Sequence, residues 1–144
     1  MEPPKSFHEL LQRYSAGERD FTGAALDQDR DNDLNGVCLD GADLSRSFIV
    51  AQFQRASLRG VRFHEANVKT CDFQHSDLRG ADFSGAALCD TSFSGANLDS
   101  ANFTGAYFHS HQLRERTRNL IGESARSAGY ALLNRAKPGV QCRS

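Results

Sequence analysis

The sequence has no stretch approaching the roughly 18 apolar residues of a membrane-spanning helix. Its first 14 residues are charged and contain no apolar run of the length found in secretory leaders. The 17 basic and 18 acidic residues leave a net charge of −1, so the chain lacks the strong positive field of a typical duplex-binding protein. These absences predict one soluble, cytoplasmic domain with no membrane association and disfavour nucleic acid as a partner.

Motifs for metal, cofactor or nucleophilic chemistry are also missing. Cys38, Cys71, Cys89 and Cys142 form no CxxC pair, which indicates neither a zinc site nor a disulfide framework and favours a reducing compartment. The sequence contains no P-loop, no GxGxxG and no GxSxG, and its five histidines lack catalytic partners at motif spacing. We therefore expect no enzyme, no catalytic residue, no metal and no cofactor.

A five-residue period dominates the chain from position 48 to position 113. Every fifth residue is large and apolar, and the residue two positions earlier is small between positions 51 and 106. A period of five fits neither the 3.6-residue repeat of a helix nor the alternation of a long strand. A chain that buries two of every five residues in this way must coil around a narrow axis, with small side chains beside the large ones.

Units such as ADFSG (81–85), ANLDS (96–100) and ANFTG (101–105) resemble the A(D/N)Lxx unit of pentapeptide-repeat proteins. The resemblance extends over residues 19–115. It implies an all-β solenoid, a right-handed quadrilateral β-helix of about five coils with four units per coil. We expect capping helices at its two ends because a solenoid otherwise exposes backbone and apolar axis there.

With four faces per coil, the large residues sort into ladders. We expect two phenylalanine ladders on opposite faces and an aliphatic ladder between them, filling the axis densely. The ladders consist of Phe53, Phe73 and Phe93; Phe63, Phe83 and Phe103; and Leu58, Leu78 and Leu98. Val68 and Leu88 belong to the fourth face.

Two irregular steps interrupt the repeat. The step from Leu44 to Phe48 is four residues, which predicts an inward position for Arg46 and a local distortion that swings it outward. The step from Leu26 to Leu34 is eight, which predicts an acidic loop over residues 27–33. Its end partly matches a calcium-binding loop, and the sequence leaves open whether the loop binds a cation.

The flanking segments have the patterns of helices. Residues 1–18 contain a capping box at Ser6 and Glu9 before an amphipathic run, which predicts a helix that caps the first coil. Residues 116–144 are expected to form a C-terminal helical cap and a tail. This last segment is basic, and its arginines either meet an acidic partner or form the wet side of the cap.

One face is unusually apolar at positions predicted to point outward, and such patches often mark binding. The alternative is that the 27–33 loop folds over part of this face. The candidate interaction patch consists of Ile49, Val50, Cys89 and Tyr107. Elsewhere Asp40, Arg59, Arg79 and Asp99 should align on the Leu58 face as exposed charge pairs.

The sequence therefore favours a non-catalytic protein-interaction module or scaffold with an unidentified protein partner. The chain is expected to be a monomer or an end-to-end dimer. The alternative comes from the resemblance to the quinolone-resistance branch of the family, whose members mimic DNA and bind type II topoisomerases such as gyrase. The balanced charge of the middle repeats and the basic C-terminal segment depart from that branch.

Overall fold

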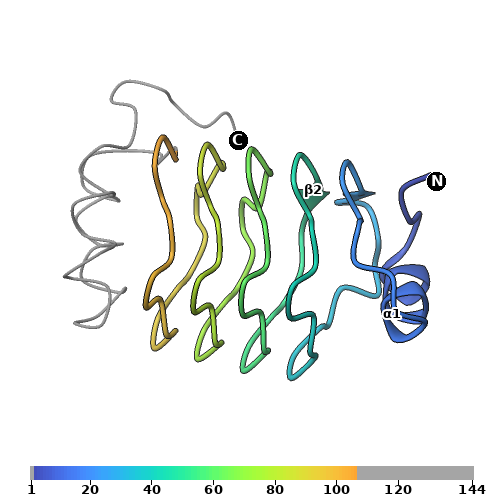
Figure 1. Ribbon diagram of the computed structural model, residues 1–144, viewed down its shortest axis with the longest axis horizontal. Helices are drawn as coiled ribbons and strands as arrows, with labels where there is room; N and C mark the ends of the chain where they lie inside the picture. The colour runs from blue at the N-terminus through green and yellow to red at the C-terminus, as the bar shows by residue number, and fades with distance from the viewer. Residues whose placement is uncertain (1, 107–144) are drawn as a thin grey trace.

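The computed structural model describes residues 2–106, and within them the backbone winds into successive coils stacked along one axis (Figure 1). Helix α1 (Phe7–Ser15) lies at the N-terminal end of this stack. Regular strand is sparse: β1 (Ala25–Leu26) pairs in parallel with β2 (Phe48–Ile49), and isolated parallel bridges join the other coils. The described part is therefore a solenoid held together from coil to coil rather than within extended strands.

The parallel pairs fall into four columns, and each column defines one face of the solenoid. We name each face after its first buried residue. The Phe21 face has Phe21, Leu44, Phe63, Phe83 and Phe103 at its centres; the Leu26 face has Leu26, Ile49, Val68 and Leu88; the Leu34 face has Leu34, Phe53, Phe73 and Phe93; the Leu39 face has Leu39, Leu58, Leu78 and Leu98. Each of these centres is buried.

Each five-residue unit, counted with the buried centre as its third position, closes with a tight turn. In the unit around Phe53, the amide of Ala56 donates to the Phe53 carbonyl at 3.1 Å, and Arg55 between them has φ 57°. A positive φ at this point suits glycine, which occupies eight of the fifteen such turns. The second position braces the turn with its side chain, as when Asp72 accepts from the amide of Gln74 at 3.0 Å.

Two stacks of phenylalanine rings fill the axis. Along each stack the ring centroids are 5.0–5.4 Å apart, with interplanar angles of 3–13°. Between the stacks the rings meet edge to face at 5.4–5.7 Å and 67–89°, a favourable arrangement of aromatic quadrupoles. The stacks contain Phe53, Phe73 and Phe93 on one side and Phe63, Phe83 and Phe103 on the other.

From Ala42 onward the first position of each unit is also buried, and its occasional polar residues are satisfied internally. The hydroxyls of Ser47 and Ser76 donate to the carbonyls of Leu44 and Phe73 at 2.6 and 2.7 Å, respectively. The described residues contain no buried side-chain oxygen or nitrogen without a hydrogen-bond partner. Alanine can therefore be replaced here by a small residue that carries its own donor.

The structure corrects the position of the shortened unit. Residues 42–46 form a complete unit, in which Arg46 is the exposed fifth residue with φ 56°. The missing residue lies in the next unit, 47–50, where Ile49 is buried and Phe48 is 42% exposed. Arg46 is exposed, as predicted, but as the fifth residue of a complete unit rather than through a local distortion. The inward position predicted for Phe48 is wrong, because Ser47 fits the small inner position and places Ile49 on the axis.

The acidic loop at residues 27–33 contacts the N-terminal helix. A carboxylate oxygen of Asp29 accepts a hydrogen bond from the backbone amide of Phe7 at 2.7 Å, and Ser6 accepts one from Glu9 at 3.1 Å. Both contacts satisfy amides at the start of α1 that have no partner inside the helix. Within residues 2–106 no group of three or more His, Cys, Asp and Glu side chains could hold a metal ion.

Helix α1 covers the open end of the first coil with a buried apolar side. Phe7 and Leu10 are each 1% exposed, and the Tyr14 hydroxyl donates to the carbonyl of Asp40 at 2.8 Å. Arg13 lies 5.7 Å from the centre of the Phe21 ring and forms an ion pair with Glu18. No described helix has the length and apolarity to cross a membrane. The C-terminal helices expected in residues 116–144 lie outside the described residues.

Replacing Phe73 with alanine should lower the free energy of unfolding by about 3–5 kcal/mol. The Phe73 ring contacts neighbours in both stacks, and its removal leaves a cavity between them. The measurement is urea unfolding followed by circular dichroism. The half-exposed Phe48 supplies the control, since Phe48→Ala should cost about 1 kcal/mol or less. Equal losses for the two variants would contradict the inward stack.

The ion pair at the end of α1 should make stability depend on pH. Hydrogen bonds from the Arg13 guanidinium hold the pKa of the Glu18 carboxyl below its ordinary value of 4.5. Glu18 therefore stabilises the fold above pH 4.5, and this contribution is lost as the pH falls through the lowered folded pKa. Glu18→Gln should reduce Tm at pH 7 and have little effect at the acid end of a pH series, whereas a constant difference at every pH would contradict this assignment.

Candidate functional site

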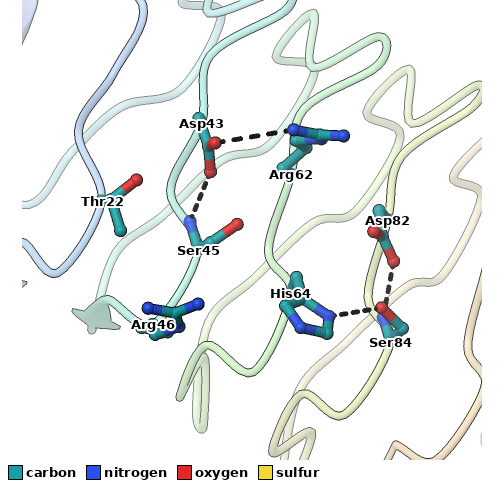
Figure 2. A pocket seen from close by; sticks show the side chains of 8 residues that line it. All are labelled: Thr22, Asp43, Ser45, Arg46, Arg62, His64, Asp82 and Ser84. Carbon is teal, nitrogen blue, oxygen red and sulfur yellow. Dashed lines mark hydrogen bonds and ion pairs between the residues drawn. The ribbon is translucent and has the colours of Figure 1, made fainter.

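A shallow groove of about 410 Å³ crosses four neighbouring coils on the Phe21 face (Figure 2). Its lining consists of Thr22, Asp43, Ser45, Arg46, Arg62, His64, Asp82 and Ser84. Apart from Arg46, these residues occupy the second and fourth positions of their units, which the repeat directs outward. The groove follows from residue size, because the short hydroxyl residues Thr22, Ser45 and Ser84 lie beside the long Arg46 and Arg62.

Hydrogen bonds fix the small side chains of the groove. Nδ1 of His64 lies 2.7 Å from the Ser84 hydroxyl oxygen in the next coil. The amides of Ser45 and Ser84 donate to Asp43 and Asp82 at 3.0 and 2.9 Å, respectively, which orients both carboxylates. The floor of the groove is therefore ordered by the same turns that build the solenoid.

The two arginines have donors to spare. Arg62 lies 3.8 Å from Asp43, and Arg46 lies 3.6 Å from Glu65, distances at which attraction persists without a good hydrogen bond. Their side chains are 66% and 68% exposed, and neither guanidinium donates a hydrogen bond within residues 2–106. Both remain available to a carboxylate or another acceptor that enters the groove.

The contact between His64 and Ser84 is a polar pair on an open surface. Nε2 of His64 is 3.6 Å from Glu65, and the histidine side chain is 43% exposed. Sites for nucleophilic catalysis commonly exclude water, and this open site does not. A search for catalytic motifs did not find this pair. His64 and Ser84 are 20 residues apart, which is one coil of the repeat, so a search for polar residues at that separation would have found them.

The structure divides the predicted interaction patch. Ile49 and Cys89 are buried, at 1% and 2% exposed, so their predicted outward exposure is wrong. Ile49 is inward because the shortened unit begins at Ser47. Val50 is half-buried, and Tyr107 lies outside the described residues. The exposed apolar group on this Leu26 face is instead Phe48, which pairs with Ala25 on one side and Asn67 on the other.

The cysteines differ in state. Cys38 and Cys71 are free, and burial raises the pKa of the Cys71 thiol to about 12, which makes it a poor nucleophile at neutral pH. Cys89 is disulfide-bonded. The expectation that the cysteines form no disulfide is therefore wrong for Cys89, because the absence of a CxxC motif does not exclude a bond between cysteines at other spacings.

Charges on the Leu39 face pair along the solenoid axis. Arg59 lies 3.0 Å from Asp40 and 3.9 Å from Asp77, while Arg79 lies 2.7 Å from Asp77. The hydrogen bond from Arg79 is the main cause that lowers the pKa of Asp77. These exposed pairs satisfy one another, so this face offers fewer spare donors than the groove does.

Charge introduced at Ile49 should unfold the protein, whereas charge at its neighbour should not. Ile49→Asp places a carboxylate on the apolar axis and should cost several kcal/mol, while Phe48→Asp enters solvent and should cost about 1 kcal/mol or less. Thermal unfolding of both variants measures the difference. A more damaging effect of Phe48→Asp would show that the opposite register holds.

Comparison with known proteins extends these observations. A family model described as "Pentapeptide repeat region" matches residues 46–119. The chain is 31% identical to alr5209, a pentapeptide repeat protein from Nostoc Pcc 7120, over 76% of this chain and 84% of that one, with a TM-score of 0.42. It is 28% identical to AT2G44920, a pentapeptide repeat protein from the Arabidopsis thaliana thylakoid lumen, over 69% and 76%, with a TM-score of 0.40.

A third solved structure is QnrB1, a plasmid-mediated fluoroquinolone resistance protein. The identity is 22% over 65% of this chain and 59% of that one, and the TM-score is 0.36. No curated protein matches the sequence.

Proposed function

The chain belongs to the pentapeptide-repeat family, and we propose that it is a non-catalytic interaction module that docks a segment of another protein in the groove of the Phe21 face. We also infer from the family a right-handed quadrilateral β-helix of about five coils with a helical cap at each end. The single observation that carries the function is the groove itself, an open, ordered, polar surface across four coils.

Rigidity supports a docking role. The groove residues project from units whose centres Leu44, Phe63 and Phe83 are at most 1% exposed, so the backbone beneath them cannot shift without disturbing the ring stacks. A surface that is already ordered loses little conformational entropy when a partner binds. The shallow form of the groove suits an extended protein segment better than a small molecule, which needs a deeper pocket.

The charges of the groove define the partner. Arg46 and Arg62 present unused donors, and Asp43 and Asp82 present acceptors beside them. We therefore expect a polar segment with a carboxylate that reaches the two arginines and a donor group that reaches an aspartate. The partner protein itself remains unidentified, and the module is expected to act as a monomer or an end-to-end dimer.

The alternative, a DNA mimic that binds a type II topoisomerase, is not favoured. The likeness to QnrB1 is too weak to carry an argument, with 22% identity and a TM-score of 0.36. A mimic of duplex DNA also needs a continuous negative surface. Here Arg46 and Arg62 interrupt the Phe21 face, and Arg59 and Arg79 interrupt the Leu39 face.

Reversal of the groove arginines tests the function. The full chain is immobilised as the native protein and as the double variant Arg46→Glu, Arg62→Glu, and proteins captured from source cells are identified by mass spectrometry. We expect a protein bound by the native chain to be lost from the variant by at least about tenfold, because two attractive contacts become repulsive.

A matched control separates this effect from altered turn geometry. Arg55 is exposed, has φ 57° and occupies the same fifth position as Arg46, but it lies on the Leu34 face. Arg55→Glu should therefore retain the captured protein. Equal capture by all three proteins, or equal loss from both variants, would exclude the groove as the docking surface.

A further inference from the structure

The fifth positions of the Phe21 face form a column at the edge of the groove, in which two side chains lie between glycines. The column consists of Gly23, Arg46, Glu65, Gly85 and Gly105. All five residues have a positive φ, 56° at Arg46 and 55° at Glu65, a conformation that glycine adopts most readily. The basic and the acidic side chain of this column are therefore neighbours on successive coils, beside a groove whose arginines have donors to spare.

The Glu65 carboxylate lies between two groups of the groove that can donate to an anion. Its Oε2 atom is 3.6 Å from Nε of Arg46, and its Oε1 atom is 3.6 Å from Nε2 of His64. Figure 2 shows Arg46 and His64 on neighbouring coils. When the Ser84 hydroxyl donates to Nδ1 of His64, the neutral imidazole carries its proton on Nε2, the side of Glu65. One carboxylate thus faces both donors.

Both contacts of Glu65 are loose. A separation of 3.6 Å is longer than a good hydrogen bond, and the side chains of Glu65 and Arg46 are 56% and 68% exposed. Exposed ion pairs of this kind contribute little to stability, because water and salt screen them. A carboxylate from another molecule that approaches to about 2.8 Å would make shorter, charge-assisted hydrogen bonds with the same two groups.

We propose that Glu65 is an internal competitor of the docked segment, because its carboxylate occupies the place between Arg46 and His64 that a carboxylate of the segment takes. This inference rests on the proposed docking function and specifies the ligand as a segment with an aspartate or glutamate side chain. Glu65 then determines specificity, since a ligand must make better contacts with the two donors than Glu65 does in order to displace it.

Glu65 has room to move away from the groove. A Cβ atom added at Gly85 would lie 3.2 Å from Cγ of Glu65, so the Glu65 side chain borders the bare backbone of the next coil. The following residue of the column, Gly105, also lacks a side chain. Glu65 can therefore turn along these two glycines when a ligand enters, with no side chain of the column in its path.

The charges of the groove favour a carboxylate over a phosphate group as the ligand. Asp43 and Asp82 line the same groove, and Asp43 is 3.8 Å from Arg62. A carboxylate that displaces Glu65 restores the single negative charge that Arg46 and His64 already face. A phosphate would bring up to two negative charges close to both aspartates.

Blocked tripeptides test the competition. Acetyl-Gly-Glu-Gly-amide and its glutamine analogue are titrated into the full chain at constant ionic strength, and the Nε–Hε resonance of Arg46 is followed by NMR. We expect a saturable shift with the glutamate peptide, none with the glutamine peptide, and no change at Arg55 on the Leu34 face. Glu65→Gln should bind the glutamate peptide about two- to fivefold more tightly, the range expected when an exposed ion pair is removed.

Glu65→Asp separates occupation of this place from the effect of charge alone. The variant keeps the negative charge on a side chain one methylene shorter, which cannot reach both donors, so it should bind the peptide nearly as tightly as Glu65→Gln does. Asp90 is an exposed acid at a fifth position of the Leu26 face with φ 58°, and Asp90→Asn should bind as the native chain does. Native affinity in either Glu65 variant, no shift of Arg46 in any protein, or tighter binding of the phosphoserine tripeptide overturns the proposal.

The titration needs no protein partner, so its outcome is separate from the capture of proteins by the native chain. Capture that depends on Arg46 and Arg62, together with native peptide affinity in Glu65→Asp, would exclude the internal competitor and retain the docking function. Tighter peptide binding by both Glu65 variants without any captured protein would support the competitor and exclude the docking function.

Discussion

The packing of phenylalanine rings around a narrow axis is the constraint on which the rest of this solenoid depends. Rings stack at 5.0–5.4 Å along each of two faces, close to the spacing between coils, and meet edge to face across the axis. This leaves room for little more than a methyl group at the neighbouring inner position, which explains the alanines. The same packing holds every coil in register, because a slip of one residue would move charged side chains onto the axis.

Because the interior is packed in the same way in each coil, the chemical differences between the faces lie in their surface side chains. The backbone is nearly the same in each coil, so one face differs from another by the side chains at the second and fourth positions. On the Leu39 face these are charges that pair with each other, and on the Phe21 face they are short hydroxyl residues flanked by arginines with free donors. On the Leu26 face they are mainly apolar. Three chemically different surfaces thus arise from one scaffold.

The two irregular units have different structural consequences. The insertion at residues 27–33 supplies Asp29, which accepts a hydrogen bond from the first turn of helix α1. This contact joins the N-terminal helix to the first coil. The deletion at residues 47–50 turns Phe48 outward and Ile49 inward, which exposes an aromatic ring on the Leu26 face. Departures from the repeat therefore give this member of the family features that the repeat by itself does not supply.

The sequence by itself determined the fold class and which residues of the long regular run face inward, because a period of five leaves one way to bury both a small and a large residue in each unit. It did not determine the register at the shortened unit, since both Phe48 and Ile49 are apolar and the step can be absorbed on either side of them. It also did not reveal the groove or the pairing of His64 with Ser84. Those depend on residues about 20 positions apart, and only the stacking of coils brings them within hydrogen-bond distance.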